Sequence, residues 1–342
     1  MIEGRAMAEE SKESTLTIRV TSLVKAKAMR RVLQEGANSV TQHRRRTSFV
    51  TCAAVLVTLF VFDLAGRYAW SESLFDESVR AQMFKHSDGL IAHIKTEYNN
   101  IFIVKHKQFL FLATRFRRED HIQTVVNLED PDDMMAPYTR IASVALVYPE
   151  TIHRILMVGL GAGSMLTYIG RAMPEAQIDA VELDPGVIAV GKRYFGLKET
   201  ERVRFIESDG LTYLSRHKDC YDIILLDAFR ELGVPSDMRT RDFYTLVKER
   251  LATQGVAVFN IAVGPKFYRS TLVSLREVFQ TVDVYPDRSA GPEEQAIAVA
   301  VPTSRPSQEV LLQRAHALQD RFRFRYPLPV LLKGRARESR DE

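Results

Sequence analysis

The chain has little cysteine. Only Cys52 and Cys220 occur in 342 residues, and neither stands in a CxxC or metal-ligand spacing. Two cysteines cannot form the framework of a small disulfide-stapled domain. The eight histidines are scattered without an HExxH motif or a His/Cys cluster, and there is no GxSxG motif. The sequence therefore predicts neither a metal site nor a serine-hydrolase triad.

A strong charge of either sign is also missing. Lys and Arg total 47 against 43 Asp and Glu, which gives a formal net charge of +4. The basic residues gather at 44–46 and 314–340, without the interleaved aromatic residues that single-strand binders use. Such clusters are usually solvated faces or membrane-proximal anchors. We therefore expect no nucleic-acid partner.

Long apolar runs are scarce, and residues 47–65 are the one candidate membrane segment. The three arginines before it would stay on the cytoplasmic side, so a signal anchor over 47–70 is the leading interpretation. A cleaved targeting peptide and an ordinary buried or interfacial helix remain open. An anchor in this orientation would place the following domain where adenosine cofactors are scarce. We expect a membrane-associated protein with a single N-terminal anchor, and otherwise a cytoplasmic one.

The composition of the chain changes along its length and predicts five segments. These are a basic polar tail (1–46), an apolar helix (47–70), connecting helices with a small β-domain (71–150), an α/β domain (151–302) and a C-terminal helix with a basic, disordered end (303–342). Short aromatic and β-branched runs over 94–130 indicate an antiparallel β-unit. A single helix is expected from Asp130 through Tyr138 to Val147.

Strand and helix patterns alternate from Arg154 onward. The predicted strands are 154–158, 178–182, 203–206, 222–227, 256–261 and 296–301, and the predicted helices lie near 164–172, 185–194, 210–216, 240–251 and 268–279. Such alternation with buried apolar strands indicates a doubly wound, mostly parallel sheet of the α/β class. Residues 281–286 and 296–301 are expected to pair as a terminal hairpin, giving one antiparallel edge.

Three alternating glycines, Gly159, Gly161 and Gly163, follow the first of these strands. The missing Cβ at such points lets a ligand approach the backbone. The dinucleotide fingerprint is G-x-G-x-x-G, but Ser164 holds its sixth position and no basic side chain lies in the loop. The spacing therefore favours a loop that packs against an amino-acid moiety over one that receives a pyrophosphate.

Acidic residues end the next two strands. Glu182 comes 23 positions after Gly159, where a carboxylate can accept both ribose hydroxyls of an adenosine-containing ligand. Asp209, followed by Gly210, ends the third strand, where a carboxylate can meet an adenine amino group. A plain surface turn is the alternative for any one of these features. Together, at consecutive strand ends, they predict a nucleoside pocket.

These motifs resemble the spermidine synthase family of the S-adenosylmethionine methyltransferase-like superfamily. The matching blocks, within residues 94–302, are VGLGAGS, VELDP, SDG, YDIILLDAF, GVP followed by TRDFY, and the upstream IQT and PYTR. The chain looks like the divergent bacterial members that are often attached to membrane segments. The resemblance implies S-adenosylmethionine or decarboxylated S-adenosylmethionine as substrate or cofactor. It also implies a homodimer, and the N-terminal apolar run leaves a subunit of a larger complex as the alternative.

The resemblance assigns a role to each matching residue. Gly159, Gly161 and Gly163 would line the amino-acid end of the cofactor, Glu182 would hold the ribose, Asp209 with Gly210 the adenine, and Gln123 the polar tail. Asp227 and Tyr138 are the catalytic candidates.

Asp227 ends the strand 222–226 and is expected to face the same crevice. Aminopropyl transfer needs a deprotonated amine held in line with an electrophilic carbon, and a carboxylate can accept the amine proton. The family pattern has a second Asp and a Pro after this residue, but Arg230 stands at the second position here. Arg140 likewise replaces an acid after Tyr138, and arginines there would repel a polyamine. A cap for the following turn is the alternative role of Asp227.

Three functions remain open. The first is an aminopropyltransferase-like transferase, and the second is a methyltransferase on the same scaffold. The third is a non-catalytic, membrane-associated subunit that keeps the fold. The sequence predicts an intact cofactor pocket and leaves the small-molecule acceptor open, with an anionic acceptor among the choices.

Overall fold

The computed structural model describes residues 74–114, 122–228, 234–262, 265–290 and 295–336. The chain divides into two compact units, Met1–Trp70 and Ser71–Glu342, and every described residue lies in the second unit. The predicted basic tail, the apolar segment 47–70 and Arg230 lie outside the described residues, so the membrane anchor stays a prediction. Within the described ranges, no helix combines the length and the apolar character needed to cross a membrane.

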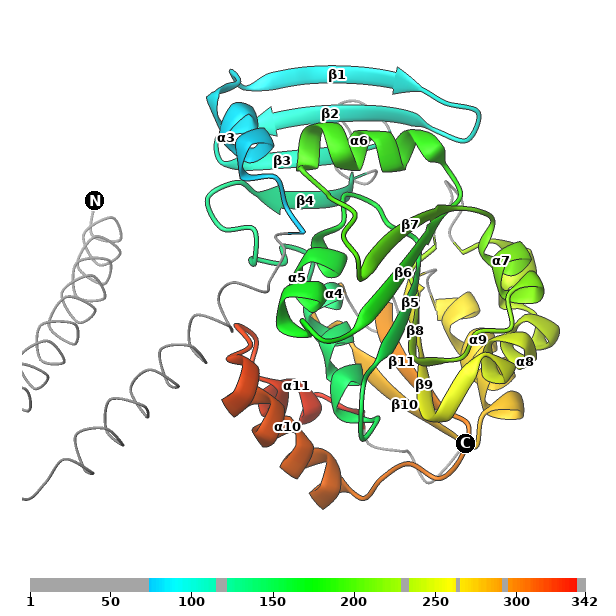
Figure 1. Ribbon diagram of the computed structural model, residues 1–342. Coiled ribbons are helices and arrows are strands. Elements are labelled where there is room, and N and C mark those ends of the chain that lie inside the picture. Colours follow the sequence, from blue (N-terminus) through cyan, green and yellow to red (C-terminus); the bar gives the residue numbers. More distant parts are fainter. Residues whose placement is uncertain (1–73, 115–121, 229–233, 263–264, 291–294, 337–342) are drawn as a thin grey trace, which may run out of the picture. The chain divides into compact units, whose positions relative to one another are not determined.

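A small antiparallel sheet comes first along the described chain (Figure 1). Its strands, in spatial order, are β1 (Gly89–Lys95), β2 (Asn100–His106), β3 (Phe109–Ala113) and β4 (Ile122–Asn127). The predicted β-unit is confirmed, but β1 begins five residues earlier than expected. A register shift between Leu90 and Ala92 interrupts the alternation of apolar and polar side chains that marks a strand.

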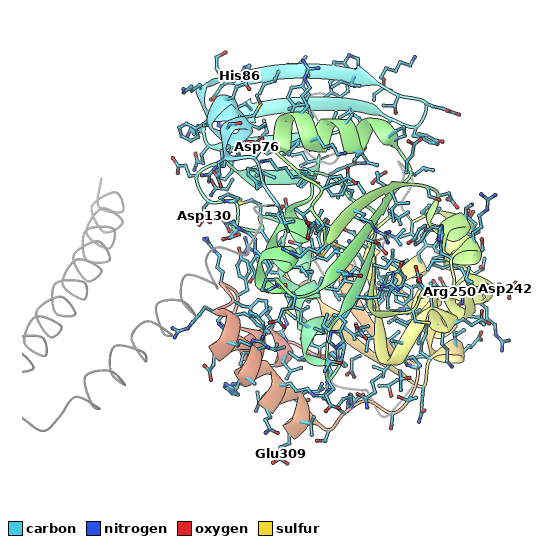
Figure 2. All side chains as sticks on the ribbon, viewed as in Figure 1. Asp76, His86, Asp130, Asp242, Arg250 and Glu309 are labelled. Atoms are coloured by element: carbon cyan, nitrogen blue, oxygen red, sulfur yellow. The ribbon has the colours of Figure 1, made fainter. Side chains whose placement is uncertain are left out.

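Two helices accompany the small sheet, α3 (Glu77–Lys85) and α6 (Pro185–Phe195). Val187, Val190 and Phe195 of α6 pack with Ile101 and Ile103 of β2 in one buried cluster. Asp76, labelled in Figure 2, caps α3. Its backbone N–H donates to the Gly196 carbonyl oxygen at 2.6 Å. Because α6 follows a strand of the large sheet, it joins the two sheets.

The large sheet has seven strands (Figure 1). They are β5 (Arg154–Val158), β6 (Gln177–Glu182), β7 (Val203–Glu207), β8 (Tyr221–Leu226), β9 (Leu251–Ala262), β10 (Thr281–Pro286) and β11 (Gln295–Val301), in the spatial order β10-β11-β9-β8-β5-β6-β7. Neighbours among β5 to β9 pair in parallel, whereas β11 pairs antiparallel with both β9 and β10. The predicted mostly parallel sheet with a terminal hairpin is confirmed.

Helices cover both faces of this sheet. One face carries α4 (Pro137–Ala142), the 3-10 helix η2 (Ser143–Val147), α5 (Ser164–Ala172), α10 (Gln308–Phe322) and α11 (Leu328–Leu332). The other carries α7 (Gly210–Arg216), the 3-10 helix η3 (Ser236–Arg239), α8 (Arg241–Glu249) and α9 (Pro265–Val278). Successive side chains of β5 alternate between the two apolar layers, with Ile155 and Met157 on one side and Leu156 and Val158 on the other. A strand buried on both faces explains the uninterrupted apolar run that precedes the glycines.

The expected single helix over 130–147 is wrong. Residues 130–136 form turns, with the Asp133 N–H donating to the Asp130 carbonyl and Met134 bridging to Val126 of β4. The helix begins only at Pro137, since proline lacks an N–H and suits the first position of a helix. It passes into the 3-10 turn of η2 after Ala142.

The expected disordered end is wrong for residues 323–336. Phe324, Leu328 and Leu332 are buried in the apolar layer shared with β5. The Ala336 N–H donates to the Val284 carbonyl at 2.7 Å, so the chain returns to the edge strand β10. Apolar residues spaced among the basic ones anchor this segment, and the high arginine content hid that pattern.

Candidate active site

The glycine loop after β5 is pressed between two other segments. The Gly159 N–H donates to the Val181 carbonyl at 2.8 Å, and the residue has a φ of 97°. A Cβ at Gly159 would lie 2.3 Å from the backbone oxygen of Asp227, and one at Gly161 would lie 2.7 Å from Thr124 Oγ1. Any side chain at either position would therefore displace the strand end of β8 or the start of β4.

The other two glycines of the predicted site serve packing. Gly163 caps α5, and a Cβ there would lie 2.5 Å from Leu197 Cδ1. A Cβ at Gly210 would lie 2.5 Å from Val158 Cγ1, where α7 meets the end of β5. Both positions need glycine because protein atoms fill the space, so that space is not open to a ligand.

Glu182 ties the glycine loop to the end of β6. Its Oε2 accepts from the Leu160 N–H at 2.9 Å, and its Oε1 accepts from the Asp184 N–H at 3.0 Å. Burial raises the pKa of this carboxyl above its ordinary value, while the backbone donors favour its ionised form. Each carboxylate oxygen can accept a second hydrogen bond, so the group is able to receive ribose hydroxyls.

The small sheet holds the segment that carries Glu182. Asp184 is fully buried at the start of α6, where its Oδ1 accepts from the Gly186 N–H at 2.8 Å. Its Oδ2 accepts from Thr96 Oγ1 at 2.6 Å and from Asn99 Nδ2 at 2.8 Å. Both donors belong to the turn between β1 and β2. The turn between β1 and β2 is therefore linked through Asp184 to the carboxylate of Glu182.

Asp209, predicted to hold the adenine, and Gln123, predicted to hold the polar tail of the cofactor, are the remaining residues of the predicted cofactor site. Asp209 follows β7 and caps α7 through Oδ1, which accepts from the Thr212 N–H at 2.9 Å. Its Oδ2 accepts no hydrogen bond from any described residue, so this oxygen is open to an amino group. Gln123 is half-buried in a bulge of β4, because Leu112 pairs with Thr124 while Ala113 pairs with Ile122. Bulges commonly redirect a side chain beside a binding site.

Asp227 lies directly after β8, the strand next to β5. Its Oδ2 accepts from the Tyr138 hydroxyl at 3.2 Å and its Oδ1 from Asn260 Nδ2 at 2.7 Å. Asn260 is fixed in turn, since its Oδ1 accepts from Gln295 Nε2 at 3.1 Å. Burial raises the pKa of Asp227 to about 6, although both donors oppose the rise. The described partners are side chains of α4 and β9, so the alternative role as a turn cap finds no contact to support it among them.

Tyr138 is a hydrogen-bond donor to this carboxylate. Burial and the neighbouring Asp227 raise the pKa of the phenol well above its ordinary value, so the hydroxyl keeps its proton. The position of Tyr138 in α4 follows from Pro137, which begins that helix.

Arg140 contacts residues of the turn before α4 and of the C-terminal segment. Its Nε donates to the Met134 carbonyl at 2.5 Å, its Nη2 lies 3.7 Å from Asp133 Oδ1, and its guanidinium stacks over the Tyr326 ring at 4.9 Å. The charge is therefore partnered within the 133–135 turn and against the C-terminal segment. The predicted repulsion of a polyamine by Arg140 stays a prediction, and the matching prediction for Arg230 falls outside the described residues.

Three residues of the site escaped the sequence-based prediction. Thr124 Oγ1 accepts from the Ala162 N–H at 3.2 Å, and Asn260 and Gln295 form the chain of amides behind Asp227. The sequence could have indicated Asn260, because it is a polar residue at the end of an apolar strand that neighbours β8. Nothing in the sequence indicated Gln295, since its contact with Asn260 joins residues that are 35 positions apart in two different strands.

No group of three or more His, Cys, Asp or Glu side chains in the described part of the chain is placed to hold a metal ion.

Known proteins are similar to this chain in sequence and in fold. The family model of the spermine/spermidine synthase domain matches residues 135–286, which include Tyr138, the glycine loop, Glu182, Asp209 and Asp227. A polyamine aminopropyltransferase of Vibrio vulnificus is 31% identical over 234 residues, which is 67% of this chain and 77% of that protein. The chain belongs to the spermine/spermidine synthase family. A solved structure of a probable spermidine synthase from Corynebacterium glutamicum has the same fold, with a TM-score of 0.57 and 17% identity over 75% of this chain and 98% of that one.

Methyltransferases are also similar to this member of the spermine/spermidine synthase family. The human eEF1A lysine and N-terminal methyltransferase is 30% identical over 202 residues, which is 54% of this chain and 29% of that protein. The similar proteins therefore include enzymes named for the transfer of different groups, an aminopropyl group and a methyl group. The fold alone does not distinguish these reactions, so only the residues of the site can favour one of them.

Proposed function

We propose that the chain transfers an aminopropyl group from decarboxylated S-adenosylmethionine to an amine, with Asp227 as the base. The single observation that carries the proposal is the position of Asp227. It follows β8 beside the glycine loop, with both carboxylate oxygens fixed by Tyr138 and Asn260 and with a pKa raised to about 6 by burial. Such a carboxylate is ionised near neutral pH and is a stronger base than an exposed one.

The nucleoside side fits the other substrate. Glu182 and Asp209 follow adjacent parallel strands, so their carboxylates meet at the same edge of the sheet as the glycine loop. Open acceptor positions on both carboxylates suit ribose hydroxyls and an adenine amino group. When bound, the sulfonium compound supplies an electrophilic carbon next to sulfur.

The residues then act on the acceptor. Asp227 orients the amine and receives the proton that its nitrogen loses as the new C–N bond forms. The electron pair of the breaking C–S bond goes to sulfur, which leaves as neutral methylthioadenosine. Tyr138 and Asn260 hold the carboxylate in place without taking the proton, because the phenol pKa is raised and an amide does not titrate. The negative charge of Asp227 also favours a cationic acceptor. The guanidinium of Arg140 is engaged by Asp133 and by the Tyr326 ring.

Methyl transfer from S-adenosylmethionine is the second candidate. The similarity to the human methyltransferase over 54% of this chain favours it. A non-catalytic role is disfavoured by the site itself, because the side chains of Tyr138 and Asn260, from separate elements, converge on a partly buried carboxylate that a packing module would not need.

Product analysis separates these functions. The full chain is incubated with decarboxylated S-adenosylmethionine and a panel of diamines, and in parallel with S-adenosylmethionine and the same amines. Release of methylthioadenosine with the decarboxylated compound supports aminopropyl transfer, whereas release of S-adenosylhomocysteine indicates methyl transfer. If neither product forms and calorimetry detects no binding of either compound at high micromolar concentration, both enzyme proposals fail.

A further inference from the structure

A cavity with a charged lining lies beside the edge strand β10 of the large sheet, away from Asp227. It has a volume of about 300 Å³ and is lined by Arg305, Lys333, Arg335, Asp283 and the first residue of α10, Gln308, among others. Asp283 belongs to the edge strand β10, which β11 and β9 separate from β8 and Asp227. The volume is at the lower end of the range for small-molecule sites.

Asp283 holds two arginines in place. This carboxylate is only 3% exposed, and it accepts from Arg305 Nη1 at 2.5 Å, from Arg335 Nη1 at 3.2 Å and from the Tyr148 hydroxyl at 2.7 Å. A nearly buried carboxylate with three donors is rigid, so the guanidinium groups that it binds are fixed before any ligand arrives.

The arginines retain donors for something else. Each binds Asp283 through a single nitrogen, and no other described residue accepts from the remaining N–H groups of Arg305 or Arg335. Their side chains are 27% and 20% exposed, respectively. Because guanidinium donors form a fork that matches carboxylate and phosphate oxygens, these free donors suit an oxyanion.

The charge of the lining is uneven. Arg305, Arg335 and Lys333 are cationic, and Asp283 is the single acid among the described lining residues, which leaves an excess of two positive charges. Lys333 is exposed and forms no ion pair with a described residue. The positive end of α10 adds to this field through Gln308. Glu309, labelled in Figure 2 at the start of α10, is exposed and is not among the lining residues.

We propose that this cavity binds a small anion that carries a doubly charged phosphoryl group. The charge excess of two matches such a group, and its several oxygens can engage both arginines and Lys333 at once. A singly charged carboxylate would leave one positive charge without a partner. The site is independent of the proposed transferase activity, since no residue of the crevice lines it.

Calorimetry on the full chain tests the proposal, with inorganic phosphate and pyrophosphate as probes and succinate as a dicarboxylate of comparable charge. We expect both phosphates to bind more tightly than succinate, and binding to weaken as salt rises. Lys333→Ala should weaken phosphate binding about tenfold, while Lys333→Arg should stay within about threefold of the original chain. Lys218→Ala is the matched control, because Lys218 is an exposed lysine that does not line the cavity, and it should leave binding unchanged.

Two further measurements define the site. Saturating methylthioadenosine should not displace phosphate, and vesicles of phosphatidylcholine with phosphatidic acid show whether a lipid headgroup or a free phosphate is the preferred source of the phosphoryl group. Sensitivity of either source to Lys333→Ala supports the proposal. The proposal is overturned if no phosphate binds, if Lys333→Ala and Lys218→Ala behave alike, if succinate binds as tightly, or if methylthioadenosine competes.

Discussion

The proposed nucleoside side and the proposed acceptor side of the site hold their carboxylates in different ways. On the nucleoside side, Glu182 and Asp209 accept from backbone N–H groups of Leu160, Asp184 and Thr212. On the acceptor side, Asp227 accepts from the side chains of Tyr138 and Asn260. The first arrangement follows from strand ends and helix starts, whereas the second depends on residues brought together from separate elements.

The difference predicts which part of the site can change during evolution. Backbone donors are present whatever residue supplies them, so the nucleoside side survives wherever the fold survives. Side-chain donors change with single substitutions, so the acceptor side can be altered while the fold is kept. This agrees with a family scaffold whose similar proteins include both aminopropyltransferases and a methyltransferase.

Asp227→Asn should separate the two sides most sharply. Removing the base should lower kcat by about 10²- to 10⁴-fold, which is the usual contribution of a positioned general base. The affinity for methylthioadenosine should stay within about threefold, because the backbone-held carboxylates are untouched. Turnover and binding are measured on the same preparation, with the exposed Asp237→Asn as the control. Unchanged turnover in Asp227→Asn would remove its catalytic role.

Glu182→Gln should produce the opposite pattern. An amide can accept only one of the two backbone donors through its oxygen, so its NH2 group would face the other N–H. We expect methylthioadenosine to bind about 10- to 100-fold more weakly, with kcat at saturation little changed. Glu207 of β7 is exposed and lies opposite Glu182 of β6 in the sheet, so Glu207→Gln is the matched control. Equal losses in both variants would show a general effect of charge instead.

The same difference explains what the sequence could predict. The mostly parallel sheet, its terminal hairpin and the strand-end positions of Gly159, Glu182 and Asp209 follow from local patterns, because apolar runs and turn residues are contiguous in the chain. The roles of Asn260 and Arg140 depend on contacts between distant segments. Arg140 looked like a reversal of charge in the crevice, yet Asp133 and the distant Tyr326 determine where its guanidinium lies. Sequence spacing contains no information on such pairs.

Thr96→Val tests whether the small sheet supports the nucleoside side. The substitution keeps the shape of the side chain and removes the 2.6 Å hydrogen bond to the buried Asp184, whose N–H donates to Glu182. We expect affinity for methylthioadenosine to fall about three- to tenfold, and kcat at saturation to stay constant. Thr96→Ser keeps the hydroxyl and should restore binding to within about twofold. A Thr96→Val chain that melts earlier but binds equally well would reduce the contact to a purely structural role.

Asn260→Leu should have the smallest effect of these substitutions, a shift of the pH dependence of kcat/KM toward higher pH. The base is the ionised form of Asp227, so kcat/KM should fall as pH drops through about 6. Because Asn260 donates to the ionised carboxylate, its removal should raise the pKa of Asp227 and move this acidic limb up by about one pH unit. Tyr138→Phe should move the limb in the same direction but less, since its hydrogen bond is 3.2 Å against 2.7 Å. A pH–rate profile of kcat/KM for the three proteins measures both shifts. An acidic limb that stays in place in Asn260→Leu would mean that Asp227 is not the group that titrates.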